Sequence, residues 1–232
     1  MDRTNEDSFV CIARIYNDFK VKFGIPRQSG MVNEVESVII FEPPYRSADS
    51  VRGLESYSCL WLLWKFSENA GKEYKPVVRP PKLGGNERIG VYATRSPFRP
   101  NPIGLSCVDI ATVEYSEMYG PVIHVRGADL MNGTPIYDIK PYVPYTDCRT
   151  YASSGLSVSP NVKTLSVCCD EKLISKVAEC KREGLLRLLS LDPRPGYHHL
   201  PDRIYSFEYG EYRIRFTVDE DVLKVYDIIR TD

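Results

Sequence analysis

Long apolar runs and paired cysteines are both missing from this 232-residue sequence. No stretch approaches the roughly 18 consecutive apolar residues that a membrane-spanning helix requires, and residues 1–7 are polar and acidic. We therefore expect a cytoplasmic protein with no membrane association. The seven cysteines form an odd set without a C-x-x-C pair, and the three histidines include only one adjacent pair, His198 and His199. Neither a disulfide framework nor a metal site is predicted, because both need such residues at defined spacings.

Four widespread motifs of nucleotide-binding proteins and hydrolases are absent as well. There is no G-x-G-x-x-G and no G-x-x-x-x-G-K-[ST], so the usual glycine loops of Rossmann proteins and ATPases are excluded. The hydrolase signatures G-x-S-x-G and H-E-x-x-H are also missing. The composition itself, 43% apolar and 26% charged with a net charge of −1, is that of an ordinary globular protein.

The first two thirds of the chain read as short strands separated by long, proline-rich connections. Residues 60–64 form a continuous apolar run that we interpret as a strand buried on both faces. The other predicted strands are rich in β-branched residues and cover residues 9–15, 37–41, 89–93, 104–110, 122–125 and 136–139. Six to eight short strands of this kind predict a barrel or a sandwich over residues 1–150.

A second, smaller domain of mixed composition is predicted for residues 155–232. Residues 152–160 read as a linker, and apolar residues recur at helical spacing from Asp170, with a predicted break at Gly184. Residues 204–209 and 212–218 alternate as a hairpin around Gly210, and residues 222–229 supply a third strand. The predicted fold class is therefore mainly β, with a small α+β domain at the C-terminus.

The most unusual composition lies between residues 75 and 102. It contains six prolines together with Gly84, Gly85 and Asn86, and proline fixes the backbone so that such loops keep one shape. Residues 75–99 also carry six basic side chains against a single acid, Glu87; the six are Lys75, Arg79, Lys82, Arg88, Arg95 and Arg99. A stiff, locally cationic surface is expected if these side chains lie together.

Residues 77–106, dense in arginine, proline and glycine, strongly resemble the signature of the TrmO (YaeB/TsaA-like) family. The resemblance continues, in the expected order, through residues 25–28, 48–55, 129–142 and 192–195. It implies a β-barrel methyltransferase outside the Rossmann class that binds S-adenosylmethionine and forms a homodimer. The implied substrate is the anticodon loop of tRNA carrying N6-threonylcarbamoyladenosine just 3′ of the anticodon, methylated on that same exocyclic nitrogen.

The resemblance also implies which residues form the cofactor pocket. Arginine can bind the carboxylate of S-adenosylmethionine, an acidic residue its ammonium or ribose hydroxyls, and apolar side chains its adenine. The implied residues are Pro26, Arg27, Gln28, Ser67, Glu68, Arg95, Leu105, Asp129, Leu130, Met131 and Asn132. The chain departs from the family pattern at Ser67 and Glu68, where His-Gln is expected, and this departure leaves a different acceptor substrate open.

Asp138 is the candidate acceptor for the proton that the methylated nitrogen loses. The alternative interpretation is a carboxylate that pairs with Lys140 or caps a turn. Candidate RNA contacts are Arg99, Lys140, Arg194 and Tyr197, with Arg79, Lys82 and Arg88 as lesser members of the cationic patch. The alternatives are that arginines of the patch brace the proline-rich loops through backbone carbonyls, and that the segment around Arg194 is only a rigid turn.

Two other functions remain open from the sequence. The chain could be a module that binds S-adenosylmethionine or RNA without chemistry, or a methyltransferase of the same fold with another acceptor. A labelled methyl donor distinguishes an enzyme from a binding module, because only the enzyme transfers the label to tRNA.

Overall fold

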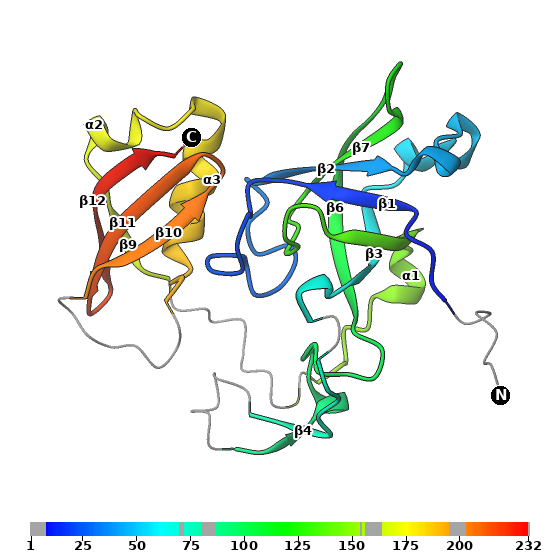
Figure 1. Cartoon of the computed structure of the whole chain (residues 1–232), viewed down its shortest axis with the longest axis horizontal. Helices are drawn as coiled ribbons and strands as arrows, with labels where there is room; N and C mark the ends of the chain where they lie inside the picture. The colour runs from blue at the N-terminus through cyan, green and yellow to red at the C-terminus, as the bar shows by residue number, and fades with distance from the viewer. Residues whose placement is uncertain are drawn as a thin grey trace.

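A computed structural model describes residues 8–69, 72–79, 87–153, 155, 164–194 and 203–231. The chain forms a barrel from its N-terminal part and a smaller α+β domain from its C-terminal part, and the two lie side by side (Figure 1). This arrangement confirms the predicted fold class. No helix within the described ranges is long and apolar enough to span a membrane.

Six strands close the barrel in the order β1-β2-β7-β6-β3-β8. Closure comes from β8 pairing back onto β1, with Ala13 opposite Ile136, so that the sheet has no free edge there. The closed sheet decides between the predicted barrel and sandwich in favour of the barrel. The strands are β1 (Ala13–Tyr16), β2 (Glu36–Phe41), β3 (Cys59–Lys65), β6 (Ile103–Ser116), β7 (Gly120–Arg126) and β8 (Pro135–Pro141).

Strand β3 alternates between the barrel interior and the outer face. Leu60, Leu62 and Trp64 are buried, whereas the residues between them are only partly buried, so the prediction of burial on both faces is wrong. The indole of Trp64 fills the interior against Gly104 of β6, where a Cβ atom would lie 2.2 Å from the ring. Trp61 faces outward instead, and its Nε1 donates to Asp147 Oδ2 at 3.0 Å.

A short arm projects from the barrel where the sequence predicted a strand over residues 89–93. Only β5 (Ile89–Gly90) is extended, paired with β4 (Val77–Val78), and the chain then turns into the 3-10 helix η6 (Val91–Ala93). The turn is stabilised by Arg99, whose Nη1 donates to the carbonyl oxygens of Val91 and Thr94 at 3.2 and 2.6 Å. The predicted strand is therefore too long by three residues.

Short helices cover the connections of the barrel. Three 3-10 helices lie between β2 and β3, a fourth follows β3, and one short α-helix follows β8. They are η1 (Pro43–Tyr45), η2 (Ala48–Val51), η3 (Leu54–Ser56), η4 (Ser67–Asn69) and α1 (Pro144–Asp147).

The C-terminal domain is a four-stranded sheet, in the order β10-β11-β12-β9, with helices α2 and α3. The predicted hairpin and third strand are confirmed, whereas the short parallel strand β9 was not predicted. The elements are β9 (Ser166–Cys168), α2 (Glu171–Ile174), α3 (Glu179–Ser190), β10 (Tyr205–Tyr209), β11 (Tyr212–Asp219) and β12 (Val222–Arg230).

Gly184 does not break the helix, contrary to the prediction. It lies inside α3, and a Cβ atom there would come within 3.0 Å of Val35 Cγ2 and 3.3 Å of the Glu34 carbonyl oxygen. The missing side chain thus lets α3 approach the backbone that precedes β2. This tertiary packing outweighs the local helix penalty of glycine.

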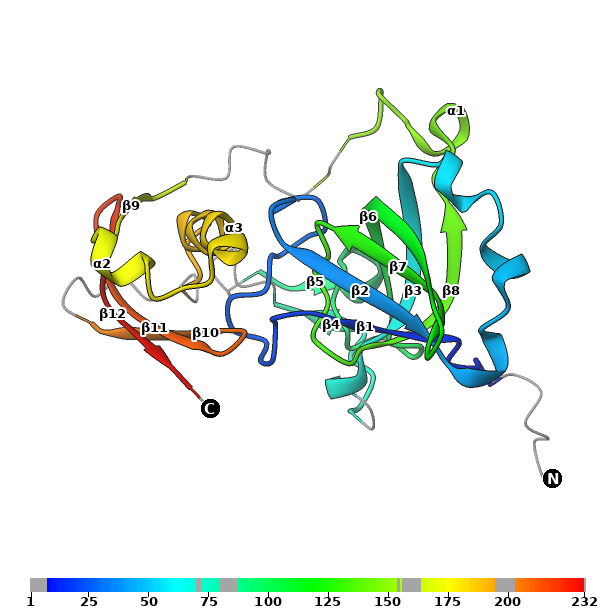
Figure 2. The same ribbon diagram turned by 90° about the horizontal axis from the view of Figure 1, so that it is seen from above.

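Residues 17–35, which connect β1 to β2, pack against the C-terminal domain rather than only against the barrel (Figure 2). Phe19, Val32 and Val35 are at most 2% exposed and belong to the core of that domain. Gly24 has a φ of +92°, and a Cβ atom there would lie 1.9 Å from the ring of Phe207. The β1–β2 connection therefore completes the core of the C-terminal domain, which is separate from the core inside the barrel.

Candidate functional site

The most informative polar group in the barrel domain is the carboxylate of Asp129, just beyond the end of β7. It is half-buried and accepts a hydrogen bond from Ser106 Oγ at 2.5 Å. Ser106 itself is 1% exposed in β6 and accepts from Trp64 Nε1 at 3.0 Å. A relay of two hydrogen bonds thus fixes Asp129 to the packed interior of the barrel.

Two other predicted cofactor residues converge on Asp129. The guanidinium of Arg95 donates to Gln28 Oε1 and lies close enough to Asp129 to favour its charged form. The neighbouring Ser29 Oγ accepts from the backbone N–H of Cys107 at 3.1 Å, which holds the loop of residues 27–29 beside β6. Burial raises the pKa of Asp129, and the Ser106 hydrogen bond and the Arg95 charge only partly oppose that shift.

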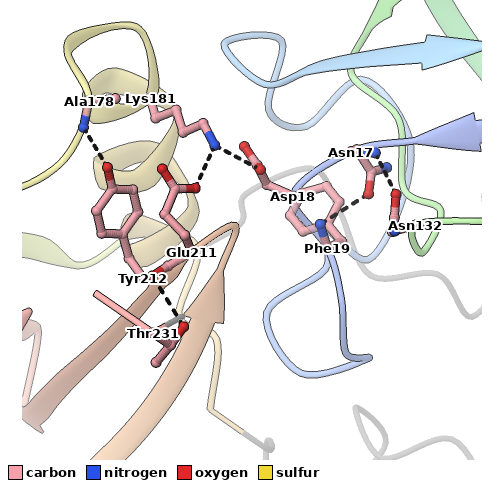
Figure 3. Close-up of polar contacts among 9 residues, drawn as sticks. All are labelled: Asn17, Asp18, Phe19, Asn132, Ala178, Lys181, Glu211, Tyr212 and Thr231. Atoms are coloured by element: carbon pink, nitrogen blue, oxygen red, sulfur yellow. Dashed lines mark hydrogen bonds and ion pairs between the residues drawn. The ribbon is translucent and has the colours of Figure 1, made fainter. Parts of the chain in front are cut away.

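The turn that follows Asp129 is tied to the end of β1. Asn132 Oδ1 accepts from the backbone N–H of Asn17 at 3.0 Å (Figure 3). The N–H of Asn132 donates to the Phe19 carbonyl oxygen at 2.9 Å. Leu130 is 1% exposed, and the Met131 carbonyl oxygen accepts from Thr134 N at 3.2 Å. The predicted segment 129–132 is therefore a rigid turn, and the side-chain oxygen of Asn132 holds the residue that follows β1.

The remaining predicted cofactor residues lie around this centre in different ways. Pro26 is buried and Arg27 is exposed, both in the loop that carries Gln28. Leu105 is 52% exposed on the outer face of β6, and strand alternation directs it away from the Ser106 side chain. Ser67 and Glu68 are exposed on η4, and no hydrogen bond links them to Asp129 within the described residues.

A pocket of about 890 Å³ lies next to the Asp129 cluster and shares Arg95 with it. Its lining is strongly cationic, because Lys75, Arg79 and Arg88 join Arg95 there. Tyr74 and Phe98 add aromatic surface, and the Lys75 ammonium lies 4.8 Å from the centre of the Phe98 ring. Cations and aromatic rings in one hollow are the groups that bind phosphates and unpaired bases.

Asp138 of β8 forms an ion pair with Lys140, with Nζ and Oδ2 2.8 Å apart. Its other oxygen accepts from the backbone N–H of Ile139 at 2.9 Å. In the sheet, Leu63 is flanked by Asp138 on one side and by Leu105 on the other, so all three residues belong to the outer face. The ion pair matches the structural alternative for Asp138, while the shared face brings it to the same side of the sheet as Leu105.

The predicted RNA contacts occupy contrasting positions. Arg99 is half-buried, and besides its two carbonyl contacts it lies over the Tyr92 ring at 5.5 Å, which favours loop bracing. Arg194 is only 9% exposed and makes two 2.8 Å hydrogen bonds to the carboxylate of Asp192, which favours a structural turn. Lys140 is exposed. Tyr197 and Lys82 lie outside the described residues.

Both domains of the chain match models of the same protein family. Residues 14–148 match the family model described as tRNA-methyltransferase O N-terminal domain, and residues 163–231 match the TrmO C-terminal domain. The chain belongs to the TrmO family. A relative from Escherichia coli K12, named tRNA (adenine(37)-N6)-methyltransferase, is 34% identical over 226 residues, 94% of this chain and 96% of the relative.

Further TrmO relatives agree with this assignment. A protein of the same name from Eikenella corrodens is 34% identical over 177 residues, covering 76% of this chain and 99% of its own. A crystal structure of TrmO from Pseudomonas aeruginosa superposes with a TM-score of 0.80 at 30% identity and covers 97% of this chain and 98% of that chain. The similarity to TrmO thus extends over both domains.

Ser106 and Ser29 belong to this candidate site but were not singled out from the sequence. Ser106 could have been found, because a hydroxyl at an inward position of an apolar strand must have a hydrogen-bond partner. Ser29 gave no comparable signal, since its contact to Cys107 joins residues 78 positions apart. Among the described residues, no three His, Cys, Asp or Glu side chains gather closely enough to hold a metal ion.

Proposed function

We propose that this chain is an S-adenosylmethionine-dependent tRNA methyltransferase that acts on the adenine 3′ of the anticodon. The acceptor is the exocyclic N6 atom of threonylcarbamoyladenosine. Two TrmO relatives carry the name tRNA (adenine(37)-N6)-methyltransferase, and one of them is similar along 94% of this chain. The single structural observation that carries the proposal is the half-buried Asp129 carboxylate beside Arg95, at the edge of a cationic pocket.

The residues around Asp129 fit the chemical groups of S-adenosylmethionine. When bound, this cofactor supplies an electrophilic methyl group. Asp129 offers acceptor oxygens to an ammonium or to ribose hydroxyls, and Arg95 offers a guanidinium to a carboxylate. The rigid turn of residues 129–132 and the loop of residues 26–28 fix these groups in place, and such positioning can supply on the order of 7 kcal/mol or more of the catalytic effect.

Asp138 is the proposed acceptor of the N6 proton. N6 already carries an acyl group, so its proton is easier to remove than that of a free amine. Asp138 would take this proton as the new carbon–nitrogen bond forms and the methyl–sulfur bond of the donor breaks. The Lys140 ammonium lies 2.8 Å from the Asp138 carboxylate. The exposure of the pair on the outer face leaves it accessible to an RNA loop.

The cationic pocket is the proposed contact with the anticodon loop. Lys75, Arg79 and Arg88 supply charge for phosphates, and Tyr74 and Phe98 supply rings for unpaired bases. Arg99 contributes through its Tyr92 contact and by holding η6, and Lys140 extends the basic surface. A cytoplasmic location and a homodimeric assembly belong to the same proposal; sedimentation at equilibrium measures the assembly.

Mass spectrometry of nucleosides tests this function. tRNA that contains threonylcarbamoyladenosine is incubated with S-adenosylmethionine, with and without the full chain, and digested. We expect one added methyl group on that nucleoside, and no methylation of tRNA that lacks the threonylcarbamoyl group. Cofactor binding without product would support the binding module instead, and methyl transfer to a different nucleoside would support another acceptor.

A further inference from the structure

A single lysine of the C-terminal domain joins the two domains by ion pairs. Lys181 Nζ, from α3, lies 2.9 Å from Asp18 Oδ1 and 2.9 Å from Glu211 Oε2 (Figure 3). Glu211 belongs to the turn between β10 and β11, whereas Asp18 follows β1 of the barrel. The ammonium is largely shielded, because the side chain of Lys181 is 25% exposed. Such shielding strengthens charge-assisted hydrogen bonds.

The backbone of Asp18 is held at the same place. Its carbonyl oxygen accepts from the N–H of Gly210 at 2.9 Å. The next residue, Phe19, is 1% exposed and lies in the core of the C-terminal domain. Asp18 is thus fixed to that domain by its side chain, its backbone and its neighbour.

Asn17 and Phe19, the neighbours of Asp18 in the chain, contact the turn of residues 129–132 at the proposed cofactor site. Asn17 donates from its backbone to Asn132 Oδ1 at 3.0 Å and from Nδ2 to the Leu130 carbonyl oxygen at 2.9 Å. Phe19 accepts from the N–H of Asn132 at 2.9 Å, and its own N–H donates to Asn17 Oδ1 at 3.0 Å. Residues on both sides of Asp18 therefore hold the turn that begins at Asp129.

We propose that Lys181 is a positioning residue for the cofactor site. Its ammonium fixes Asp18, and Asn17 and Phe19 thereby hold the turn of residues 129–132 in the geometry that binds the cofactor. This inference rests on the proposed function, because it concerns the same pocket. It gives the C-terminal domain a part in binding the methyl donor, at a distance and without contact to it.

The two carboxylates on Lys181 provide a matched pair of variants. Asp18→Asn removes the partner on the barrel side, whereas Glu211→Gln removes the partner inside the C-terminal domain and leaves the Asp18 contact. Lys181→Met removes both ion pairs, and Lys181→Arg restores a cation. All variants are made in the full chain, and S-adenosylmethionine binding is measured by calorimetry alongside kcat and KM.

We expect Asp18→Asn and Lys181→Met to weaken S-adenosylmethionine binding by about 5- to 10-fold, a typical size for coupling through a hydrogen-bond network. KM for the cofactor should rise by a similar factor, while kcat at saturating cofactor stays within about twofold. Glu211→Gln should leave affinity within about twofold of the wild type, and Lys181→Arg should recover most of it.

Hydrogen exchange of the cofactor-free chain gives a readout that does not depend on binding. The amides of Asn17 and Asn132 should exchange faster in Asp18→Asn, whereas in Glu211→Gln they should keep the wild-type rate. Wild-type affinity in Asp18→Asn, or an equal loss of affinity in Glu211→Gln, would overturn the positioning role. A wild-type chain that binds no S-adenosylmethionine would overturn the proposed function itself.

Discussion

Asp129 in the barrel site and Glu211 at the domain interface are both hydrogen-bonded carboxylates, yet their pKa values shift in opposite directions. Burial raises the pKa of Asp129, although the Ser106 hydroxyl, backbone N–H groups and the nearby Arg95 charge partly oppose the shift. The hydrogen bond from Lys181 lowers the pKa of Glu211 to about 2. A carboxylate whose charge is fully matched stabilises the fold, whereas one left short of positive charge is available to a cationic ligand.

The packing at the interface predicts the largest effect on stability. Gly24→Ala should lower the free energy of unfolding by about 3 kcal/mol, because it combines a left-handed backbone with a clash against the buried Phe207 ring. Gly53→Ala is the matched control in the barrel domain, since Gly53 has a φ of +87° but nothing within 4 Å of the added Cβ atom. It should lose only about 1 kcal/mol. Urea titration measures both, and equal losses would contradict close packing at Gly24.

The exposed carboxylate of the outer face should matter for turnover and not for stability. Asp138→Asn is expected to leave cofactor affinity intact while reducing kcat by about 10²-fold, since it removes the proton acceptor. Glu208→Gln is a suitable control, because Glu208 is also paired with a basic residue, Arg213 at 3.0 Å, but lies in the C-terminal domain. Near-normal turnover in Asp138→Asn would eliminate the proposed acceptor.

The half-buried carboxylate should matter for the cofactor. Asp129→Asn is expected to weaken S-adenosylmethionine binding by about 30-fold, in line with the loss of a hydrogen bond to a charged group. Asp109→Asn provides the control, since Asp109 is another partly buried carboxylate, which accepts from Asn33 Nδ2 at 3.0 Å. Calorimetric titration distinguishes them, and unchanged affinity in Asp129→Asn would remove the observation on which the proposed function rests.

Charge in the pocket predicts a smaller, salt-dependent effect. Arg88→Ala should weaken tRNA binding several-fold and reduce the slope of log affinity against log salt by about 1, as expected for one phosphate contact. Arg213→Ala, in the outward face of the C-terminal sheet, should leave the slope unchanged. Filter binding over a range of salt concentrations measures both slopes, and a wild-type affinity without salt dependence would make the basic patch structural.

The contributions of Glu211 and Asp129 to stability should change in opposite directions as the pH falls. The lowered pKa of Glu211 means that its contribution to stability is present above about pH 4.5 and is lost as the pH falls toward about 2. The raised pKa of Asp129 has the opposite sign, so its ionised form opposes folding at neutral pH and the opposition disappears in acid. Glu211→Gln should therefore flatten the acid limb of a plot of stability against pH. Asp129→Asn should stabilise the chain at neutral pH, and a fall in stability there would contradict the shift.

The strands of the barrel could be predicted from the sequence because their signal is local. Residues 37–41 and 122–125 are rich in β-branched side chains, and the structure places β2 and β7 there. The orientation of Trp61 and the continuity of α3 through Gly184 could not be predicted. Both depend on the neighbour that each face meets, and that neighbour is distant in the sequence.

In the candidate site, too, residues with a local sequence signal could be predicted, whereas contacts between distant residues could not. Arg95, Gln28 and Asp129 were expected from the resemblance to a known family, and the structure brings them together. The network behind them was not expected, because Lys181 and Asp18 are 163 residues apart and neither belongs to a recognisable motif. For Arg194 the sequence context suggested an RNA contact, whereas in the structure its guanidinium forms an ion pair with Asp192.

The burial of the β1–β2 connection in the C-terminal core has a consequence for how the molecule comes apart. Phe19, Val32 and Val35 belong to the barrel half of the chain but are buried with the C-terminal strands. A protease cut between residues 155 and 164 would therefore leave two pieces that stay bound to each other through this packing. Expressed alone, the barrel half would expose the apolar side chains of its β1–β2 connection to water and would tend to precipitate.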